Sequence, residues 1–152
     1  MEVNEDLAYI LGALRDGSLP RPSNNKFQVT FACDWYKPWI TEIVVPKVQK
    51  VFNLPSTKIK IYEKWSHKSK RPFFRLMVYS KKLHQLLSRI YPPGNQKNWT
   101  TPSIIKNGKL EEQIEYVRGF YDAEGGCRDI EKFLVGKTLS LIHISEPTRL
   151  GM

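Results

Sequence analysis

Apolar residues near the start of the chain recur at the spacing of a helix. They share one face of a predicted helix over residues 5–16, at Leu7, Ile10, Leu11 and Leu14. Asn4 precedes this helix and is suited to cap it, because its side-chain oxygen can accept a backbone N–H of the first turn. Gly17 and then Pro20 predict that the helix ends there.

The next segment alternates between apolar and polar residues, which predicts a half-buried strand over residues 26–33. Its apolar face holds Phe27, Val29, Phe31 and Cys33, and its polar face holds Lys26, Gln28 and Thr30. Residues 21–25 have the composition of a turn, and residues 19–21 are expected to form a short strand that pairs with the longer one.

The middle of the chain predicts a helix, a β-hairpin and another helix. The first helix covers residues 38–52, and Pro46 inside it implies a kink or a late start. Strands over residues 58–65 and 73–79 are joined by a basic loop, and Ser80 then caps a helix that runs to Ile90. The apolar residues expected to face inward from the two helices are Trp39, Ile40, Ile43, Val44, Val48, Val51, Leu83, Leu86, Leu87 and Ile90.

Proline and glycine mark residues 92–109 as a linker, and a last helix is predicted from Leu110 to Glu124. Two segments then resemble each other, YILGALRDG at residues 9–17 and YVRGFYDAEG at residues 116–125. Each is an apolar helix that contains a glycine and ends on an acid followed by glycine. Because the macrodipole is negative at that end of a helix, Asp16 and Glu124 suggest a positive group between them, such as a metal ion.

The chain carries a net charge of +9 and has a pI of about 9.6, which favours a polyanionic partner, nucleic acid before membrane. No apolar run reaches the roughly 18–20 residues of a membrane span, and the acidic N-terminus is unlike a signal peptide. The two cysteines, Cys33 and Cys127, form neither a disulfide framework nor a metal-spaced cluster. We interpret both as reduced core thiols and expect a cytoplasmic protein.

The order of elements and the two segments resemble the LAGLIDADG homing endonucleases, in the two-motif, single-chain form of archaeal members. The resemblance covers roughly residues 5–130, and residues 92–99 are similar to the linker of that form. It implies an α+β fold with an αββαββα repeat: residues 1–92 form the first half-domain, 93–109 the linker, and 110–138 the start of a second half-domain, truncated after its motif helix. Residues 139–152 resemble a translated sequencing adapter, so we expect this tail to be non-native.

The resemblance further implies that the two motif helices cross closely through small residues, at Ala8, Gly12, Ala13, Gly119 and Ala123. Asp16 and Glu124 would then bind Mg²⁺ or another divalent cation and hydrolyse DNA across its minor groove. The spacing differs, however, because Asp16 follows Gly12 by four residues and Glu124 follows Gly119 by five. One residue fewer turns a carboxylate by about 100° on an ideal helix. The geometry that the resemblance implies is therefore kept only if the first helix loosens or shifts by one residue near Arg15.

The resemblance places double-stranded DNA on the polar side of the strands, since a two-stranded ribbon fits the major groove. The expected DNA-binding residues are Arg21, Asn24, Lys26, Gln28, Thr30, Lys58, Lys60, Tyr62, Lys64, Lys68, Lys70, Arg71 and Arg75. Lys97 is a candidate for an accessory basic residue near the metals, and Asp122 is a weaker acid with a packing or capping role. Trp35, Trp39, Trp65 and Trp99 are interpreted as core or docking aromatics, and His67 and His84 as surface residues.

Two alternatives stay open at this stage. One is a non-catalytic nucleic-acid-binding relative, such as an intron maturase or a DNA-binding regulator, and the other is a decaying, inactive copy. Asp16 and Glu124 favour the nuclease, because a binding protein can lose both carboxylates. The short first motif fits the inactive copy. The full-length form is expected to be a monomer, and the truncated chain an inactive fragment.

Overall fold

In the computed structural model, residues 3–65 and 71–124 are described. The expectations for His67, Lys68, Lys70, Cys127 and the adapter-like tail therefore lie outside the described residues. The elements, in chain order, are α1 (Glu5–Leu14), β1 (Gln28–Asp34), a π-helix (Trp39–Val44), α2 (Val45–Phe52), a 3₁₀ turn (Ser56–Lys58), β2 (Ile59–Lys64), β3 (Phe73–Tyr79), α3 (Lys81–Ser88), a 3₁₀ turn (Gln96–Asn98), α4 (Ser103–Lys106) and α5 (Leu110–Ala123).

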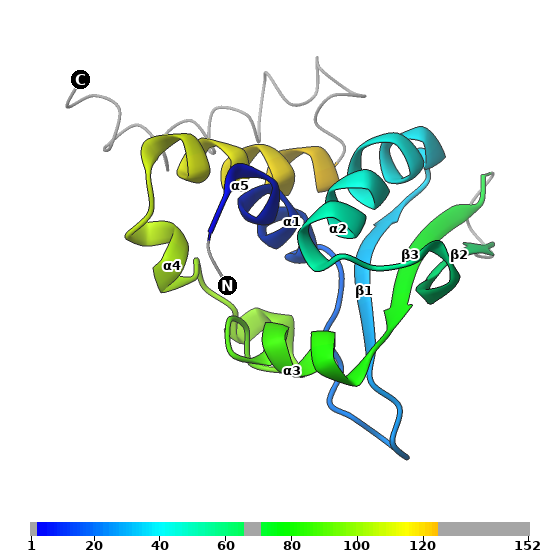
Figure 1. Ribbon diagram of the computed structural model, residues 1–152. Helices are drawn as coiled ribbons and strands as arrows, with labels where there is room; N and C mark the ends of the chain where they lie inside the picture. The colour runs from blue at the N-terminus through cyan, green and yellow to red at the C-terminus, as the bar shows by residue number, and fades with distance from the viewer. Residues whose placement is uncertain (1–2, 66–70, 125–152) are drawn as a thin grey trace.

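The helices and strands form the expected α+β arrangement (Figure 1). The three strands make an antiparallel sheet in the order β1-β3-β2. Helix α1 packs against β1, α2 and α5, and α3 also contacts β1. The strand expected over residues 19–21 is absent from this sheet. Instead, an isolated β-bridge joins Ser18 and Thr30, whose backbone groups exchange hydrogen bonds of 2.9 and 3.0 Å.

A β-bulge corrects the expected faces of β1. Its register against β3 shifts between Thr30 and Ala32, so Ala32 stands opposite Leu76 and Cys33 stands opposite Arg75. A bulge inserts one unpaired residue, and every later side chain changes face. Cys33 therefore does not continue the apolar face of Val29, as the alternation predicted, and is only half-buried.

Pro46 divides the second predicted helix into two parts. The chain enters through the π-helical turns of Trp39–Val44 and continues as α2, in which Pro46 occupies the first turn. Proline is tolerated there because the first N–H groups of a helix have no partner within it. The wider π turn changes which side chains share a face, and Ile43, expected to be inward, is 41% exposed.

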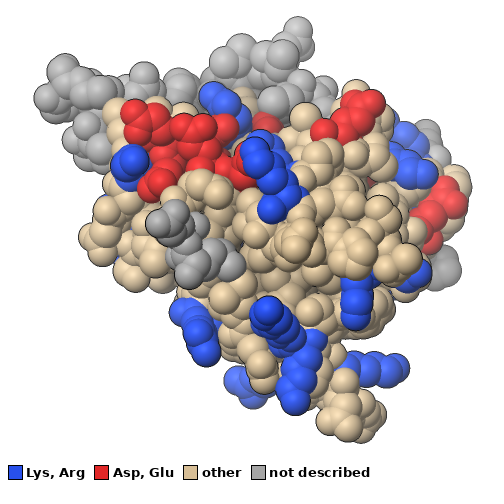
Figure 2. All heavy atoms as spheres, viewed as in Figure 1, with Lys and Arg blue, Asp and Glu red and all other residues tan. Residues whose placement is uncertain are grey.

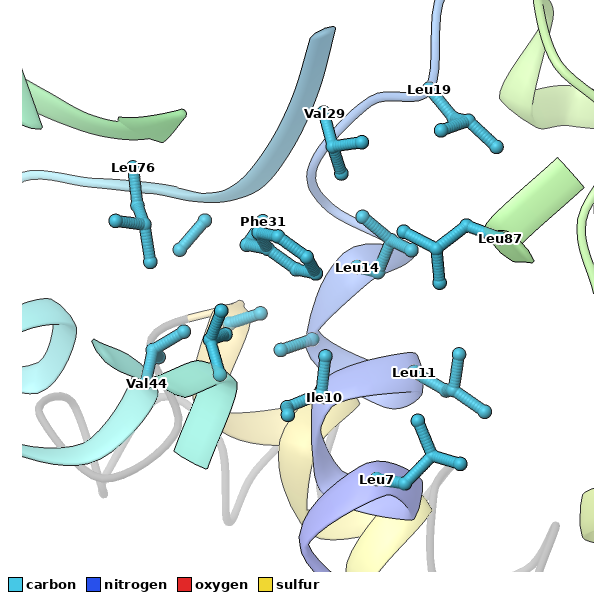
Figure 3. Packing of buried hydrophobic residues seen from close by; sticks show 14 of the residues in the cluster. Leu7, Ile10, Leu11, Leu14, Leu19, Val29, Phe31, Val44, Leu76 and Leu87 are labelled. Atoms are coloured by element: carbon cyan, nitrogen blue, oxygen red, sulfur yellow. The ribbon is translucent and has the colours of Figure 1, made fainter. Parts of the chain in front are cut away.

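The hydrophobic core lies between α1 and the sheet, with contributions from the π-helix and α3 (Figure 3). Nearly every position of α1 is buried, and Asn4 caps it as expected by accepting a 2.7 Å hydrogen bond from the backbone N–H of Leu7. Full burial of a large apolar side chain contributes roughly 1.5–3 kcal/mol. The core residues labelled in Figure 3 are Leu7, Ile10, Leu11, Leu14, Leu19, Val29, Phe31, Val44, Leu76 and Leu87.

His84 is a core residue, and the expectation of a surface position was wrong. Only 2% of it is exposed, and its Nε2 lies 2.7 Å from the carbonyl oxygen of Pro20. Its ring meets Phe27 edge-on at a centroid distance of 5.5 Å. His84 therefore connects α3 to the segment that leads into β1 through these two contacts.

The linker is structured rather than open. Beside its 3₁₀ turn and α4, it buries Trp99, whose ring stacks on Tyr91 at a centroid distance of 4.3 Å. Trp39 is buried as well, whereas Trp35 and Trp65 are exposed. Over the described ranges, no helix combines the length and apolar character that crossing a membrane would require.

Candidate functional site

The two glycine-containing helices cross in direct backbone contact, as the small residues predicted. A Cβ atom on Gly12 would lie 2.0 Å from the carbonyl oxygen of Tyr116, and one on Gly119 would lie 2.1 Å from that of Tyr9. No side chain fits at such distances. The glycines of both helices are therefore required by the crossing itself.

Both acids lie just beyond this crossing. Asp16 follows the end of α1 by two residues and is exposed, and Glu124 is the C-cap of α5 and is half-buried. Figure 1 shows α1 and α5 side by side and running in the same general direction. Each helix therefore carries a carboxylate at its C-terminal end, on the same side of the crossing.

A tight turn compensates for the shorter spacing of Asp16. The backbone N–H groups of Arg15, Asp16 and Gly17 bond to the carbonyls three residues earlier, at 3.2, 3.1 and 2.8 Å. Each 3₁₀ step rises about 2.0 Å and turns about 120°, against about 1.5 Å and 100° in an α-helix. With three such steps and one α step, the path from Gly12 to Asp16 rises about 7.5 Å, the same as the five α steps from Gly119 to Glu124. The difference in rotation about the helix axis between the two acids then falls from about 100° to about 40°. The end of the first motif helix is therefore wound more tightly than an α-helix, and it does not loosen.

The tyrosines near the crossing form a pseudo-symmetric pair of contacts. Tyr9 and Tyr116 each lie three residues before their glycine, and Arg15 and Asp122 each lie three residues after it. The Tyr9 hydroxyl donates to Asp122 Oδ2 at 2.5 Å, and an Arg15 guanidinium N–H donates to the Tyr116 hydroxyl at 3.0 Å. Arg15 therefore occupies in the first motif the place of Asp122 in the second, and the missing residue falls between Arg15 and Asp16.

Asp122 belongs to a buried network. It is 7% exposed, and the Tyr9 hydroxyl that donates to it accepts a 2.8 Å bond from the indole N–H of Trp39. The chain of donors joins α1, α5 and the π-helix. This placement supports the packing role expected for Asp122 and leaves Glu124 as the outer acid of its motif.

Replacing Tyr9 with phenylalanine is expected to lower the free energy of unfolding by about 1–3 kcal/mol, because two buried polar groups each lose a hydrogen bond. Urea unfolding followed by tryptophan fluorescence measures the change. Tyr36→Phe, at an exposed tyrosine, is the control. A loss for Tyr9→Phe no larger than that of the control would contradict the network.

Tyr91 ties the linker to both motif helices. Its hydroxyl donates to the carbonyl of Leu11 at 2.8 Å and lies 3.2 Å from the hydroxyl of Tyr116. Burial raises the pKa of Tyr91 far above its ordinary value, and the neighbouring Tyr116 raises it further. The phenol therefore stays neutral and remains a donor.

The outer face of the sheet carries the expected polar row. Lys60, Tyr62 and Lys64 alternate along β2 and are exposed, and Tyr62 stands opposite Arg75 of β3. In the same row, a hydrogen bond to Tyr62 is the largest cause of the raised pKa of Tyr79. Lys and Arg contact phosphates, and Arg also reads base edges.

Three expected DNA contacts are placed differently from the prediction. Lys58 is exposed but lies in the 3₁₀ turn before β2, and Lys26 lies in the turn before β1, bridged to Ser23. Thr30 is only 6% exposed, and its backbone pairs with Ser18 on one side and with Met77 on the other. Among the described residues of this set, Arg21, Asn24 and Arg71 are exposed, and Gln28 is half-buried.

An exposed aromatic group at one end of the sheet was not predicted. Trp65 is 65% exposed, Trp35 and Phe73 are also exposed, and the Arg71 guanidinium lies 3.8 Å from the ring centroid of Trp35. Exposed aromatic rings beside cations suit stacking on nucleobases. The sequence held one signal for this group: Trp65 stands just before the basic loop, at the end of a strand, where a large apolar side chain is not required by the core.

Charge is distributed unevenly over the surface. In the view of Figure 2, acidic side chains gather over α5, whose first turn contains Glu111 and Glu112. Lysine and arginine side chains gather around α3 and the loop that leads into β1. A polyanion is repelled by the acidic region and attracted to the basic one.

Lys97 is exposed and lies in the 3₁₀ turn of the linker, directly after Gln96. The side-chain amide of Gln96 donates to the carbonyl of Gly17, so this part of the linker runs beside the turn that carries Asp16. This position is compatible with the accessory basic role expected for Lys97.

The donor set at the helix ends fits a hard divalent cation that retains water. Among the described residues, no group of three or more His, Cys, Asp or Glu side chains could hold a metal ion. Mg²⁺ does not need such a group, because it is usually bound by one or two carboxylates together with water and substrate phosphates. Asp16 and Glu124 meet that requirement in number and kind.

The chain is similar in sequence to a protein of named activity. No family model matches the chain. It is 35% identical over 124 residues to the homing endonuclease I-ApeI of Aeropyrum pernix, an alignment that covers 78% of this chain and 51% of that protein. The chain thus spans about half the length of the curated relative it matches.

Two solved structures share the fold. A variant of I-DmoI in complex with its target DNA and Mn aligns with a TM-score of 0.52 at 20% identity, covering 78% of this chain and 59% of that one. I-DmoI in complex with DNA and Ca aligns with a TM-score of 0.50 at 20% identity, covering 79% and 57%. The chain is therefore similar in sequence to a homing endonuclease and has the fold of the LAGLIDADG homing endonucleases, as expected.

Proposed function

We propose that this chain is part of a site-specific, double-strand DNA endonuclease of the homing type that uses Mg²⁺ or another divalent cation. The observation that carries the proposal is the pair of motif helices, which touch through Gly12 and Gly119 and each end in a carboxylate. The similarity to I-ApeI supports it. The turn that compensates for the short first motif counts against an inactive copy.

In this proposal, Asp16 and Glu124 hold the cation. When bound, the metal supplies charge neutralisation at the scissile phosphate and lowers the pKa of a coordinated water. The two carboxylates would repel each other without it. Lys97 would add positive charge beside the phosphate, and the backbone contact of the helices would fix the separation of the two acids.

The outer face of the sheet would lie in the major groove. Lys60, Lys64 and Arg75 would contact phosphates or base edges, and Tyr62 would lie among them. We propose further contacts from Arg21, Asn24, Lys26, Gln28, Lys58 and Arg71, and leave out the buried Thr30. With both motifs on one chain, the full-length protein would act as a monomer.

Changing Lys60, Lys64 and Arg75 together to glutamine is expected to weaken DNA binding. Each lost phosphate contact should also reduce the slope of log affinity against log salt by about 0.9. Fluorescence anisotropy with a labelled duplex at several salt concentrations measures both. Lys106→Gln on α4, an exposed lysine away from the sheet, is the control and should change the affinity far less. Equal effects of the triple variant and the control would contradict the proposed face.

Cleavage is tested with the protein expressed from the whole gene. Plasmids that carry the uninterrupted allele of its host locus should be cut in both strands when Mg²⁺ is added and should stay intact with EDTA. A protein that binds the plasmid at one site and never cuts it would instead be the non-catalytic, DNA-binding alternative.

A further inference from the structure

Gln96 of the linker contacts the backbone on both sides of Asp16. Its side-chain amide donates to the carbonyl of Gly17 and, at 3.4 Å, to that of Arg15. A glutamine amide has two N–H donors, which suits two carbonyl acceptors. Gln96 therefore bonds to the residues directly before and after Asp16, the acid that ends the first motif.

The rest of the linker runs antiparallel to the same segment. The Gly94 N–H donates to the carbonyl of Leu19 at 2.9 Å, and the carbonyl of Trp99 accepts from the Arg15 guanidinium at 3.3 Å. Gln96 lies between these two contacts. Stacking of Trp99 on Tyr91 anchors the linker to the core next to this pairing.

The turn at Asp16 needs such support. The last carbonyls of a helix have no partner within it, and 3₁₀ bonds have poorer geometry than α-helical ones. In the second motif, the full spacing lets α5 continue as an α-helix through Ala123. In the first, the position of the acid depends on a turn that the helix alone holds weakly.

We propose that Gln96 is a positioning residue for Asp16: it holds the tight turn that replaces the missing residue and so aims the carboxylate at the metal. The inference rests on the proposed metal site and adds to it a residue outside both motifs. Gln96 would touch no reacting group and would act only through the backbone of residues 15–17.

The test compares two glutamines that make the same kind of contact. Gln113 on α5 also donates to two carbonyls, those of Ile105 at 3.2 Å and Lys106 at 3.0 Å, at the other end of the linker. Gln96→Met and Gln113→Met each keep the side-chain length and remove both donors. Mn²⁺ binding to the 152-residue chain is followed by electron paramagnetic resonance, and hydrogen exchange of the Asp16 and Gly17 amides by NMR.

Gln96→Met is expected to weaken Mn²⁺ binding by about tenfold, in the range found when outer-shell partners of metal ligands are removed. It should also speed exchange at Asp16 and Gly17. Gln113→Met should change neither. Unchanged Mn²⁺ affinity in Gln96→Met would overturn the proposal if Asp16→Asn weakens binding in the same assay.

Failure of the metal site itself gives a different result. If Asp16→Asn binds Mn²⁺ as the unaltered chain does, the proposed function fails, and the exchange measurement alone judges Gln96. Faster exchange in Gln96→Met would then still show that Gln96 stabilises the turn at Asp16. Unchanged exchange would show that it does not.

Discussion

Replacing Gly12 with alanine is expected to destabilise the protein, although the same change inside a helix ordinarily stabilises it by about 1 kcal/mol. The new methyl group would lie 2.0 Å from the carbonyl oxygen of Tyr116, in the backbone of the facing helix. Neither backbone can give way like a side chain, so α1 and α5 must separate. Overpacking of this kind costs about 1–3 kcal/mol or more, and urea unfolding measures it.

The matching change at Gly119 should have the same sign, because its Cβ would lie 2.1 Å from the carbonyl of Tyr9. The two glycines share one crossing, so the double variant should lose less stability than the sum of the single losses. Once the helices have separated, the second methyl group meets less resistance. Stabilisation by either alanine would contradict the backbone contact, and strict additivity would contradict a shared one.

Asp16→Asn and Glu124→Gln are each expected to lower metal-dependent DNA cleavage by at least about 100-fold, the scale seen when one preorganised charge-stabilising group is lost. Each substitution is close to isosteric and removes a negative charge. Asp16 is exposed and Glu124 ends its helix, so the fold should be retained. The assay is plasmid cleavage by the protein from the whole gene, with unfolding measured in parallel.

Asp122→Asn is the matched control within the same motif. Its carboxylate is buried against the Tyr9 hydroxyl, so this change should reduce stability more than it reduces cleavage at low temperature. Full cleavage by Asp16→Asn or by Glu124→Gln would remove that residue from the catalytic assignment.

Elements with an uninterrupted pattern could be predicted closely. β3 spans the predicted residues Phe73–Tyr79, since its alternation contains no bulge and Ser80 caps the helix that follows. α5 begins at the predicted Leu110 and ends within one residue of the predicted Glu124. In these segments the local signals all favour the same structure.

The errors arise where tertiary contacts override periodicity. The bulge in β1 leaves no mark in the alternation of Phe27, Val29 and Phe31, yet it turns Cys33 to the other face. His84 looks like a surface residue until the carbonyl of Pro20, distant in sequence, supplies its partner.

Part of the candidate site could likewise be predicted from the sequence, and part could not. The close crossing could be predicted, because a glycine inside each of two similar helices is costly unless another backbone approaches. The tight turn before Asp16 and its contact with Gln96 could not, because they depend on a linker about 80 residues further along the chain.

Asp16 and Glu124 are proposed to belong to a single metal site. Titration of the 152-residue chain with Mn²⁺, followed by electron paramagnetic resonance, tests it most directly. We expect one site, whose affinity falls in Asp16→Asn, falls in Glu124→Gln, and falls little further when both changes are combined. Binding that survives either change, or two sites lost independently, would contradict it.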